Sequence, residues 1–462
     1  MKRMFTVYTI AGVLAIFVFQ GFQCASPEFT GAKVYIQQRN FAEALPLLEN
    51  EVKNNPQNEE AWYLLGAIRA DMDNYAGMNE AFDQALKISN VHAAEIRGIR
   101  FNKWGLHVNA GVNLLERASA DSAGFYDESI DEFQKSINAW PDTAITYRYL
   151  AYAYNNKGDM ENALKIFLKA WEMGDESESA KRAGLIYIRR GDELKNKFET
   201  DNKEKIASVN NLQRVRRNTP KNDVQSILGK PDKVTPGPRG SRKEDWTYAK
   251  YNLKLTIESD KVTVKEVKPP YNPGIDSTSY RNAVAQYANA IEILEEARKK
   301  DPADGDVIAL LMQGYIGADK INEAISTFLI QVQRDPTNKQ NHYVLGVLYR
   351  SAGKFEEAIT SFQEALKIDS EFTDATYDIG ATYYNWGVDV IRMAEERGDI
   401  ESKEYVEKFE KALPFMEKVS MSADRSNSPE IWETLGTIYA RLGKTTQATQ
   451  AFEKADKLRQ GN

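Results

Sequence analysis

Small and large apolar residues recur along this chain with a period of 34 positions. Nine segments carry a small residue, a large apolar residue four positions later, and usually another small residue three positions after that. The first positions of these segments are Ala44, Met78, Ser129, Ala163, Ala290, Ala324, Ala358, Ala412 and Ala448, of which only Met78 is not small. Four successive spacings are 34 and one is 36, while three exceed 34 by 17, 93 and 20. A fixed period with tolerated insertions predicts an all-α stack of helical hairpins.

Two helices are expected in each repeat. Leu345, Gly346 and Tyr349 lie at the spacing of one helix face, and a turn at Gly353 follows. The second helix then carries Ala358 and, on the same face, Phe362 and Ala365. Small residues allow two helices to approach closely, and the aromatic ring fills the remaining space. Prolines stand where several second helices are expected to end, at Pro56, Pro141, Pro302 and Pro336.

With this period and these residue types, the chain resembles the tetratricopeptide-repeat (TPR) family over most of its length. The resemblance implies an α-solenoid that binds a protein or peptide partner on the concave face formed by its first helices. It does not identify the partner, because a fold does not fix a function.

The N-terminal segment 1–24 has the features of an export signal. Lys2 and Arg3 precede an apolar run over 4–22, and Cys24 follows it. This layout resembles a bacterial lipoprotein, which implies that Cys24 is lipidated.

The residues before the cysteine depart from that family's pattern of Leu, a small residue, and then Gly, Ala or Ser. Gly21, Phe22 and Gln23 occupy these positions. An uncleaved anchor is an alternative, because the apolar run is nearly long enough to span a bilayer. A simple cleaved signal is another. Each alternative places the rest of the chain outside the cytoplasm.

The largest excess between repeats divides the solenoid. We expect an N-terminal half over 25–199, with repeats 1–4 and the first helix of repeat 5. An inserted α+β domain over 200–272 follows, and a C-terminal half over 273–462 holds the second helix of repeat 5 and repeats 6–9. Within the insertion, a short helix with Pro220 in its first turn and a stop at Gly229 precedes strands expected at 246–248, 253–257 and 262–267.

This insertion resembles the SmpA/OmlA type of small outer-membrane lipoprotein, which implies an association with β-barrel protein assembly. The residues that carry the resemblance are Val224, Leu228, Gly229, Pro231, Trp246 and Tyr248. The alternative is an insertion that only packs on the solenoid. Between 203 and 243 the segment has eleven Lys or Arg and three Asp or Glu. This charge could meet an acidic partner or anionic head groups, or the side chains could simply be solvated.

The excesses of 17 and 20 predict elongated first helices in repeats 3 and 8. The stretch 101–105 aligns with 383–387, and apolar residues continue at helical spacing after both. Such helices could carry a docking surface or brace neighbouring repeats.

No catalytic constellation is present in the sequence, so an enzyme is not expected. Phosphate-loop, nucleophile-elbow and zinc-protease motifs are all missing. One cysteine and three scattered histidines cannot form a recognisable zinc cluster, and we expect His92, His107 and His342 to be ordinary surface or groove residues. The net charge of -7 argues against nucleic-acid binding. We therefore predict no cofactor, no metal and no small-molecule substrate.

The first-helix positions that line the concave face in the TPR family are mostly neutral here. They lack the set of Lys and Arg that grips a peptide carboxylate in some members. Tyrosine buries a large area and keeps a hydrogen-bonding group, so these positions suit an extended peptide or a partner helix. The candidate groove residues are Tyr63, Arg148, Tyr152, Asn155, Gln313 and Tyr343.

The function expected from these features is that of a non-enzymatic scaffold. We expect it to be tethered through its N-terminus, on the periplasmic face of the outer membrane, where it aids assembly of outer-membrane or secreted proteins. The alternatives are a scaffold of another envelope complex, for polysaccharide export, cell-wall synthesis or secretion, and a ligand-binding protein associated with an enzyme.

Overall fold

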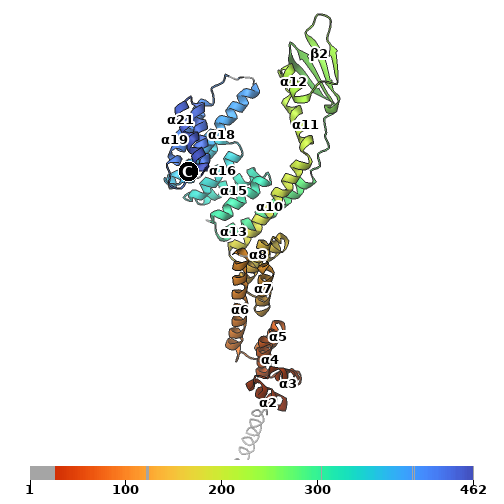
Figure 1. The fold of residues 1–462 in the computed structure, drawn as a ribbon, viewed down its shortest axis with the longest axis vertical. Coiled ribbons are helices and arrows are strands. Elements are labelled where there is room, and N and C mark those ends of the chain that lie inside the picture. The colour runs from red at the N-terminus through yellow and green to blue at the C-terminus, as the bar shows by residue number, and fades with distance from the viewer. Residues whose placement is uncertain (1–25, 121–123, 303, 398, 400, 461–462) are drawn as a thin grey trace, which may run out of the picture. The chain divides into compact units, whose positions relative to one another are not determined.

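The computed structural model describes residues 26–120, 124–302, 304–397, 399 and 401–460 (Figure 1). The predicted lipidation residue Cys24 and the signal segment lie outside the described residues. The chain divides into two compact units, Met1–Ser179 and Ala180–Asn462, which are described separately below.

The first unit consists of helical hairpins, and the first residues of α10 complete it. Its pairs are α2 (Pro27–Gln37) with α3 (Phe41–Asn54), α4 (Glu59–Asp71) with α5 (Tyr75–Ile88), α6 (Ala93–Ala120) with α7 (Phe125–Ala139), and α8 (Ala144–Lys157) with α9 (Met160–Glu172). The second helices end before the prolines, as predicted. Asn58 and Asn74 cap the N-termini of α4 and α5, because each side chain accepts a hydrogen bond from a backbone N–H of the first turn.

The second unit contains the remaining hairpins and the insertion. Its solenoid helices are α10 (Ser177–Asp201), α13 (Thr278–Lys300), α14 (Gly305–Gly317), α15 (Ile321–Arg334), α16 (Lys339–Ser351), α17 (Phe355–Ile368), α18 (Thr373–Arg397), α19 (Val406–Ser420), α20 (Pro429–Arg441) and α21 (Thr445–Arg459). The insertion separates α10 from its partner α13. The prediction of an all-α solenoid with a small inserted α+β element is therefore confirmed.

Close helix contact within a hairpin requires the small residues of the repeat. A Cβ atom added at Gly346 of α16 would lie 2.5 Å from the ring of Phe362 on α17. The equivalent pair of Gly436 and Phe452 in the last repeat has the same geometry, with 2.6 Å. A larger side chain at either glycine forces the ring or the helix to move, which explains the residue types of the 34-residue pattern.

Ala358→Leu is expected to destabilise the second unit more than Lys354→Ala. Ala358 has no exposed surface and sits where α16 and α17 meet, whereas Lys354 is exposed at the start of α17. Overpacking costs about 1–3 kcal/mol, and a surface substitution changes the free energy of unfolding by about 0.5 kcal/mol or less. Chemical denaturation of the two variants measures this difference, and equal midpoints would show that the repeat register is wrong.

The insertion forms a lobe of two helices and one antiparallel sheet. It comprises α11 (Lys203–Arg214), α12 (Lys221–Leu228), β1 (Lys233–Pro236), β2 (Lys243–Tyr248), β3 (Leu253–Glu258) and β4 (Lys261–Val267), in the sheet order β1-β2-β3-β4. Alternate residues of the central strands, such as Trp246 and Leu255, are buried on one face. Val224 of α12 and Leu212 of α11 complete that core. The lobe therefore has a hydrophobic core of its own.

The sequence did not predict α11 or β1. All four residues of β1 are exposed, and the strand carries a proline, so no alternation of buried and exposed residues marks it. Its pairing with β2, from Lys233 opposite Thr247 to Pro236 opposite Glu244, defines it.

The two ends of the lobe are joined by hydrogen bonds. Asn202, at the end of α10, donates through Nδ2 to the carbonyl of Asp276 (3.0 Å). The backbone N–H of Asp276 donates to Oδ1 of Asn202, also at 3.0 Å. Lys205 donates to the carbonyl of Gly274. The chain thus leaves the solenoid and returns to it at nearly the same point.

Candidate interaction surface

Two of the candidate groove residues of α8, Arg148 and Tyr152, contact residues at the start of the next first helix. Arg148 forms an ion pair with Asp175, with 3.4 Å between Nη1 and Oδ1. The hydroxyl of Tyr152 donates to Glu178 of α10 at 2.9 Å, and its ring packs edge-on against Phe167. Both side chains are partly exposed, so they join two repeats and still contribute to the surface.

Tyr63 of α4 is used in the same way. Its ring stacks on His92, just before α6, with 4.1 Å between the ring centroids. Burial raises the pKa of Tyr63, and the negative charges of Glu95 and Glu59 raise it further. The imidazole of His92 also contacts Glu59, with 2.8 Å between Nδ1 and Oε2. The hydroxyl of Tyr63 therefore remains protonated at neutral pH and can act as a hydrogen-bond donor.

Tyr343 of α16 occupies the corresponding position in the second unit. Its ring lies between Phe362 and Phe372, at centroid distances of 5.7 and 5.0 Å. Burial raises the pKa of Tyr343, and the neighbouring carboxylate of Asp378 on α18 adds to that effect. Arg350 pairs with the same carboxylate. A polar seam thus joins α16 to α18.

Two candidates, Asn155 and Gln313, form no side-chain hydrogen bond, ion pair or ring contact with a described residue of another repeat. Asn155 donates to its neighbour Asn156 at 3.2 Å, and Gln313 of α14 is exposed. Tyr63, Arg148, Tyr152 and Asn155 belong to the first unit, and Gln313 and Tyr343 to the second. Four of the six residues therefore contact neighbouring repeats, whereas Asn155 and Gln313 do not. The binding role of all six stays a prediction.

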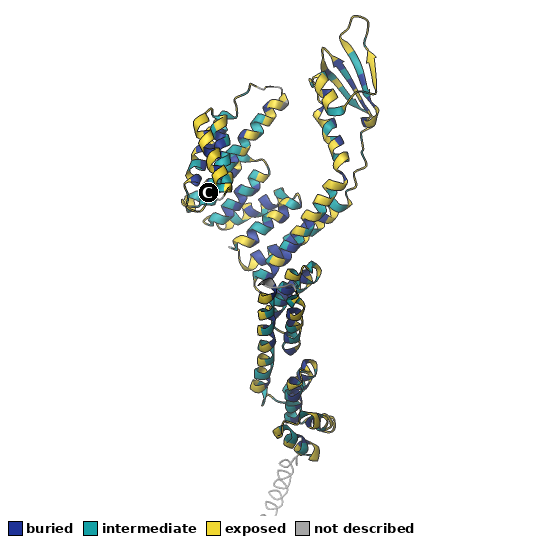
Figure 2. Ribbon diagram, in the orientation of Figure 1, coloured by how far each residue is buried: buried dark blue, intermediate teal, exposed yellow. Residues whose placement is uncertain are grey.

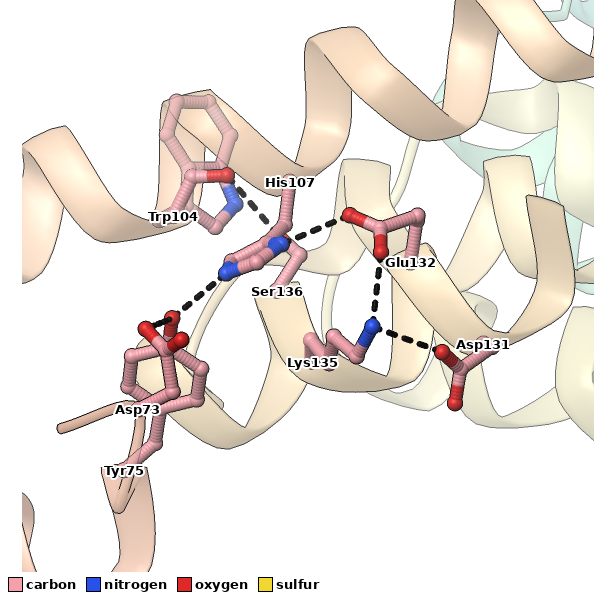
Figure 3. A network of polar contacts seen from close by, with 8 residues as sticks. All are labelled: Asp73, Tyr75, Trp104, His107, Asp131, Glu132, Lys135 and Ser136. Carbon is pink, nitrogen blue, oxygen red and sulfur yellow. Dashed lines mark hydrogen bonds and ion pairs between the residues drawn. The ribbon is translucent and has the colours of Figure 1, made fainter. Parts of the chain in front are cut away.

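The elongated helix α6 is braced by a polar network in its extension (Figure 3). Nε2 of His107 lies 2.5 Å from the hydroxyl of Tyr75 on α5, and Nδ1 lies 2.7 Å from Oε2 of Glu132 on α7. The Tyr75 hydroxyl also donates to Asp73 at 2.7 Å. The two ring nitrogens of His107 therefore link α5 to α7.

Charges on α7 complete this network. Lys135 donates to Oε1 of Glu132 and forms an ion pair with Asp131, both at 2.7 Å. Burial alone would raise the pKa of Glu132, but hydrogen bonds from His107 and Lys135 lower it. The extension of α6 thus contacts the preceding and the following second helix, which is the bracing role that the sequence left open.

Two histidines are less exposed than the sequence suggested. His107 is 8% exposed and His342 is 9% exposed, where Nε2 of His342 contacts the carbonyl of Pro336 at 2.9 Å. The expectation of ordinary surface or groove residues was wrong for them. His107 contacts side chains of the two flanking second helices, whereas His342 contacts a backbone carbonyl in the turn before its own helix. No sequence signal identified His107, since it lies in an extension outside the 34-residue register.

An exposed aromatic cluster adjoins the network. Phe101 is 54% exposed, and its ring packs against Trp104 and Trp140 at centroid distances of 5.4 and 6.2 Å. The indole N–H of Trp104 donates to Thr146 of α8 at 2.8 Å, which fixes its orientation. Repeat 3 thereby presents apolar aromatic surface that the candidate groove set omitted.

The described residues include no group of three or more His, Cys, Asp or Glu that could hold a metal ion. A cavity of about 500 Å³ lies between the end of α18 and the start of α19, and its lining includes Glu395, Lys403 and Arg441 but no histidine or cysteine. The charged groups that line this cavity can make polar contacts, but no nucleophile is paired there with a histidine base.

Among the helices described, none is long and apolar enough to cross a membrane.

Family models match four segments of the chain. A model described as "TPR repeat" matches residues 346–387, and models described as "Tetratricopeptide repeat" match 29–91, 119–178 and 429–462. Together these segments cover less than half of the chain, and the solenoid helices within them match the tetratricopeptide repeat.

Curated relatives share this repeat at low identity. Human Superkiller complex protein 3 is 19% identical over 75% of this chain, and a TPR repeat-containing protein of Methanocaldococcus jannaschii is 20% identical over 92% of it. The chain spans a quarter of the human relative's length and 68% of the archaeal one. Among solved structures, the MamA protein is 20% identical, with a TM-score of 0.29, 39% of this chain covered and 87% of that chain. A TPR protein of Thermus thermophilus is 20% identical, with a TM-score of 0.27, and the match covers 39% of this chain and 90% of that chain.

Proposed function

We propose that this chain, whose solenoid matches tetratricopeptide-repeat models in four segments, is a membrane-tethered, non-enzymatic scaffold on the periplasmic side of a bacterial envelope, where it aids assembly of outer-membrane or secreted proteins. The observation that carries the proposal is the pairing of a repeat solenoid with a lobe that has its own core and leaves the stack at a single point. With two such elements, one can hold the chain in a complex and the other can recruit a partner.

The first-helix surfaces support a protein-binding role. Tyr63, Arg148, Tyr152 and Tyr343 are held by neighbouring repeats, so their side chains are ordered before any partner binds. Ordered side chains lose less conformational entropy on association, which favours affinity. The aromatic cluster around Phe101 adds apolar area to this surface.

The location is proposed from the sequence of the N-terminal segment. The basic residues, the apolar run and Cys24 together support export followed by tethering. The resemblance of the insertion to the SmpA/OmlA type supports the outer membrane as the site.

Cys24→Ser is expected to release the protein from membranes, because a lipid anchor on Cys24 cannot form without the thiol. Several acyl chains give stable attachment, whereas one holds weakly. Fractionation of cells that express the variant or the wild type measures the change. A variant that remains as membrane-bound as the wild type would show that the apolar run is itself the anchor.

Co-purification in mild detergent, followed by mass spectrometry, tests the function. The proposal predicts that barrel-assembly components are recovered with the full chain. Recovery of polysaccharide-export, cell-wall or secretion-machinery components in their place would contradict it. The Ala358→Leu variant is the matched control for partners that require a folded solenoid.

A further inference from the structure

The lobe carries a charge opposite to that of the rest of the chain. Residues 203–272 contain 16 Lys or Arg and eight Asp or Glu, a net charge of +8. The whole chain has a net charge of -7, so the remainder carries -15. A charge separation of this size makes the lobe the part of the chain that attracts anions.

Backbone hydrogen bonds bring four cations of the lobe to one end of its sheet. The N–H of Ser259, in the β3–β4 turn, donates to the carbonyl of Arg242 in the β1–β2 loop at 3.2 Å. The N–H of Asn218 donates to the carbonyl of Val262 at 2.8 Å, which places the α11–α12 loop beside the start of β4. Four of the exposed cations at this end, named the basic tip, are Arg217, Arg239, Arg242 and Lys261.

The basic tip is exposed and lacks ion-pair partners. Its four residues are exposed, and none of them forms an ion pair with another described residue. The ribbon of the long loop at the free end of the sheet has the exposed colour over most of its length (Figure 2). Other cations of the lobe are neutralised, since Lys221 pairs with Glu244 and Lys254 pairs with Asp245 at 3.1 Å. The charge of the basic tip is therefore available to a partner.

We propose that the basic tip binds an acidic polypeptide segment, which is the partner class that the scaffold would recruit. This inference rests on the proposed function and adds the chemistry of one partner to it. A guanidinium group offers a planar set of N–H donors that matches a carboxylate in two parallel hydrogen bonds. Three of the four cations are arginines, so a chain of Asp and Glu side chains can pair with them in turn.

The local charges favour a polypeptide over an anionic bilayer. Glu258 and Asp260 are exposed at the same end of the sheet, and a uniformly negative surface would repel both. A flexible segment can place its carboxylates on the arginines and avoid them. The exposed large apolar side chains of the lobe, Val234 and Val264, lie within strands, so the tip has no apolar anchor for a membrane.

Binding of a fluorescent oligoglutamate peptide to the full chain tests the proposal, with oligoglutamine as the control peptide. The variant Arg217→Glu/Arg239→Glu/Arg242→Glu is compared with Lys165→Glu/Lys454→Glu/Lys457→Glu, which changes the net charge equally on exposed solenoid positions. Reversal of the tip should weaken peptide binding about tenfold at low salt, given the strength of exposed ion pairs. The solenoid variant should bind as the wild type does, and added salt should weaken binding.

Equal oligoglutamate affinity of the two variants would overturn the proposal. A second arm uses vesicles of phosphatidylglycerol and phosphatidylcholine, with pure phosphatidylcholine vesicles as the control for tethering through the N-terminus. Tip-dependent binding to the anionic vesicles without peptide binding would assign the tip to a membrane surface and would also overturn it. Peptide binding that persists when co-purification yields no envelope components would reject the proposed cellular function and leave the acidic-segment site standing.

Discussion

Tyr287→Ala is expected to destabilise the second unit severely, because this one side chain joins the helices on both sides of the insertion. Tyr287 lies on α13 and is 1% exposed. Its ring fills the space beside Gly191 of α10, where an added Cβ would lie 2.7 Å from it, and it also contacts Gly317 of α14. Loss of a buried aromatic ring typically costs about 3–5 kcal/mol.

The hydroxyl of Tyr287 provides the control. It donates to Asp192 of α10 at 2.6 Å. Tyr287→Phe keeps the ring and removes this bond, so it should cost only about 1 kcal/mol. Denaturant unfolding followed by circular dichroism measures both variants. An alanine variant as stable as the phenylalanine variant would mean that α10 and α13 do not form one hairpin.

Excision of the lobe is expected to leave a folded solenoid and to abolish recruitment of the lobe's partner. Asn202 and Asp276 are hydrogen-bonded to each other, so a short Gly-Ser linker can replace residues 203–275. Each repeat of a solenoid is stabilised by its neighbours, and these contacts do not pass through the lobe's separate core. Helical content per residue should rise slightly, because the lobe contains the sheet.

Two measurements separate the outcomes of the excision. Thermal unfolding should remain cooperative, and co-purification should lose the components that the lobe recruits. The triple arginine variant is the matched control, since it keeps the lobe and changes only its charge. A broad, non-cooperative transition after excision would mean that the lobe is part of the solenoid core.

The repeat could be predicted from sequence because its packing depends on residue size at fixed spacing. Gly346 must be small and Phe362 large for α16 and α17 to pack closely. The spacing of small and large residues therefore predicts the hairpin. Periodic spacing also indicated the elongated α6 and α18, which have 28 and 25 residues. Strand β1 carries no comparable signal, because its four side chains are exposed and its identity depends on pairing with β2.

The candidate surface was less predictable than the fold. Register placed Arg148 and Tyr152 on a first helix, but it could not show that Asp175 and Glu178 of the next repeat bind them. The bracing by His107 was missed for a related reason. Its partners Tyr75 and Glu132 lie 32 and 25 positions away. Glu132 is separated from His107 by the extra residues of repeat 3, which do not follow the 34-residue period. Contacts between repeats depend on side-chain geometry that a periodic pattern does not contain.

Hydrogen exchange of the excised chain tests most directly whether a continuous solenoid carries a separable lobe. We expect the backbone amides of α10 and α13 around Gly191 and Tyr287 to stay as protected as in the full chain, because their packing does not involve the lobe. Loss of protection in both helices after excision, with the remaining repeats unchanged, would contradict this expectation.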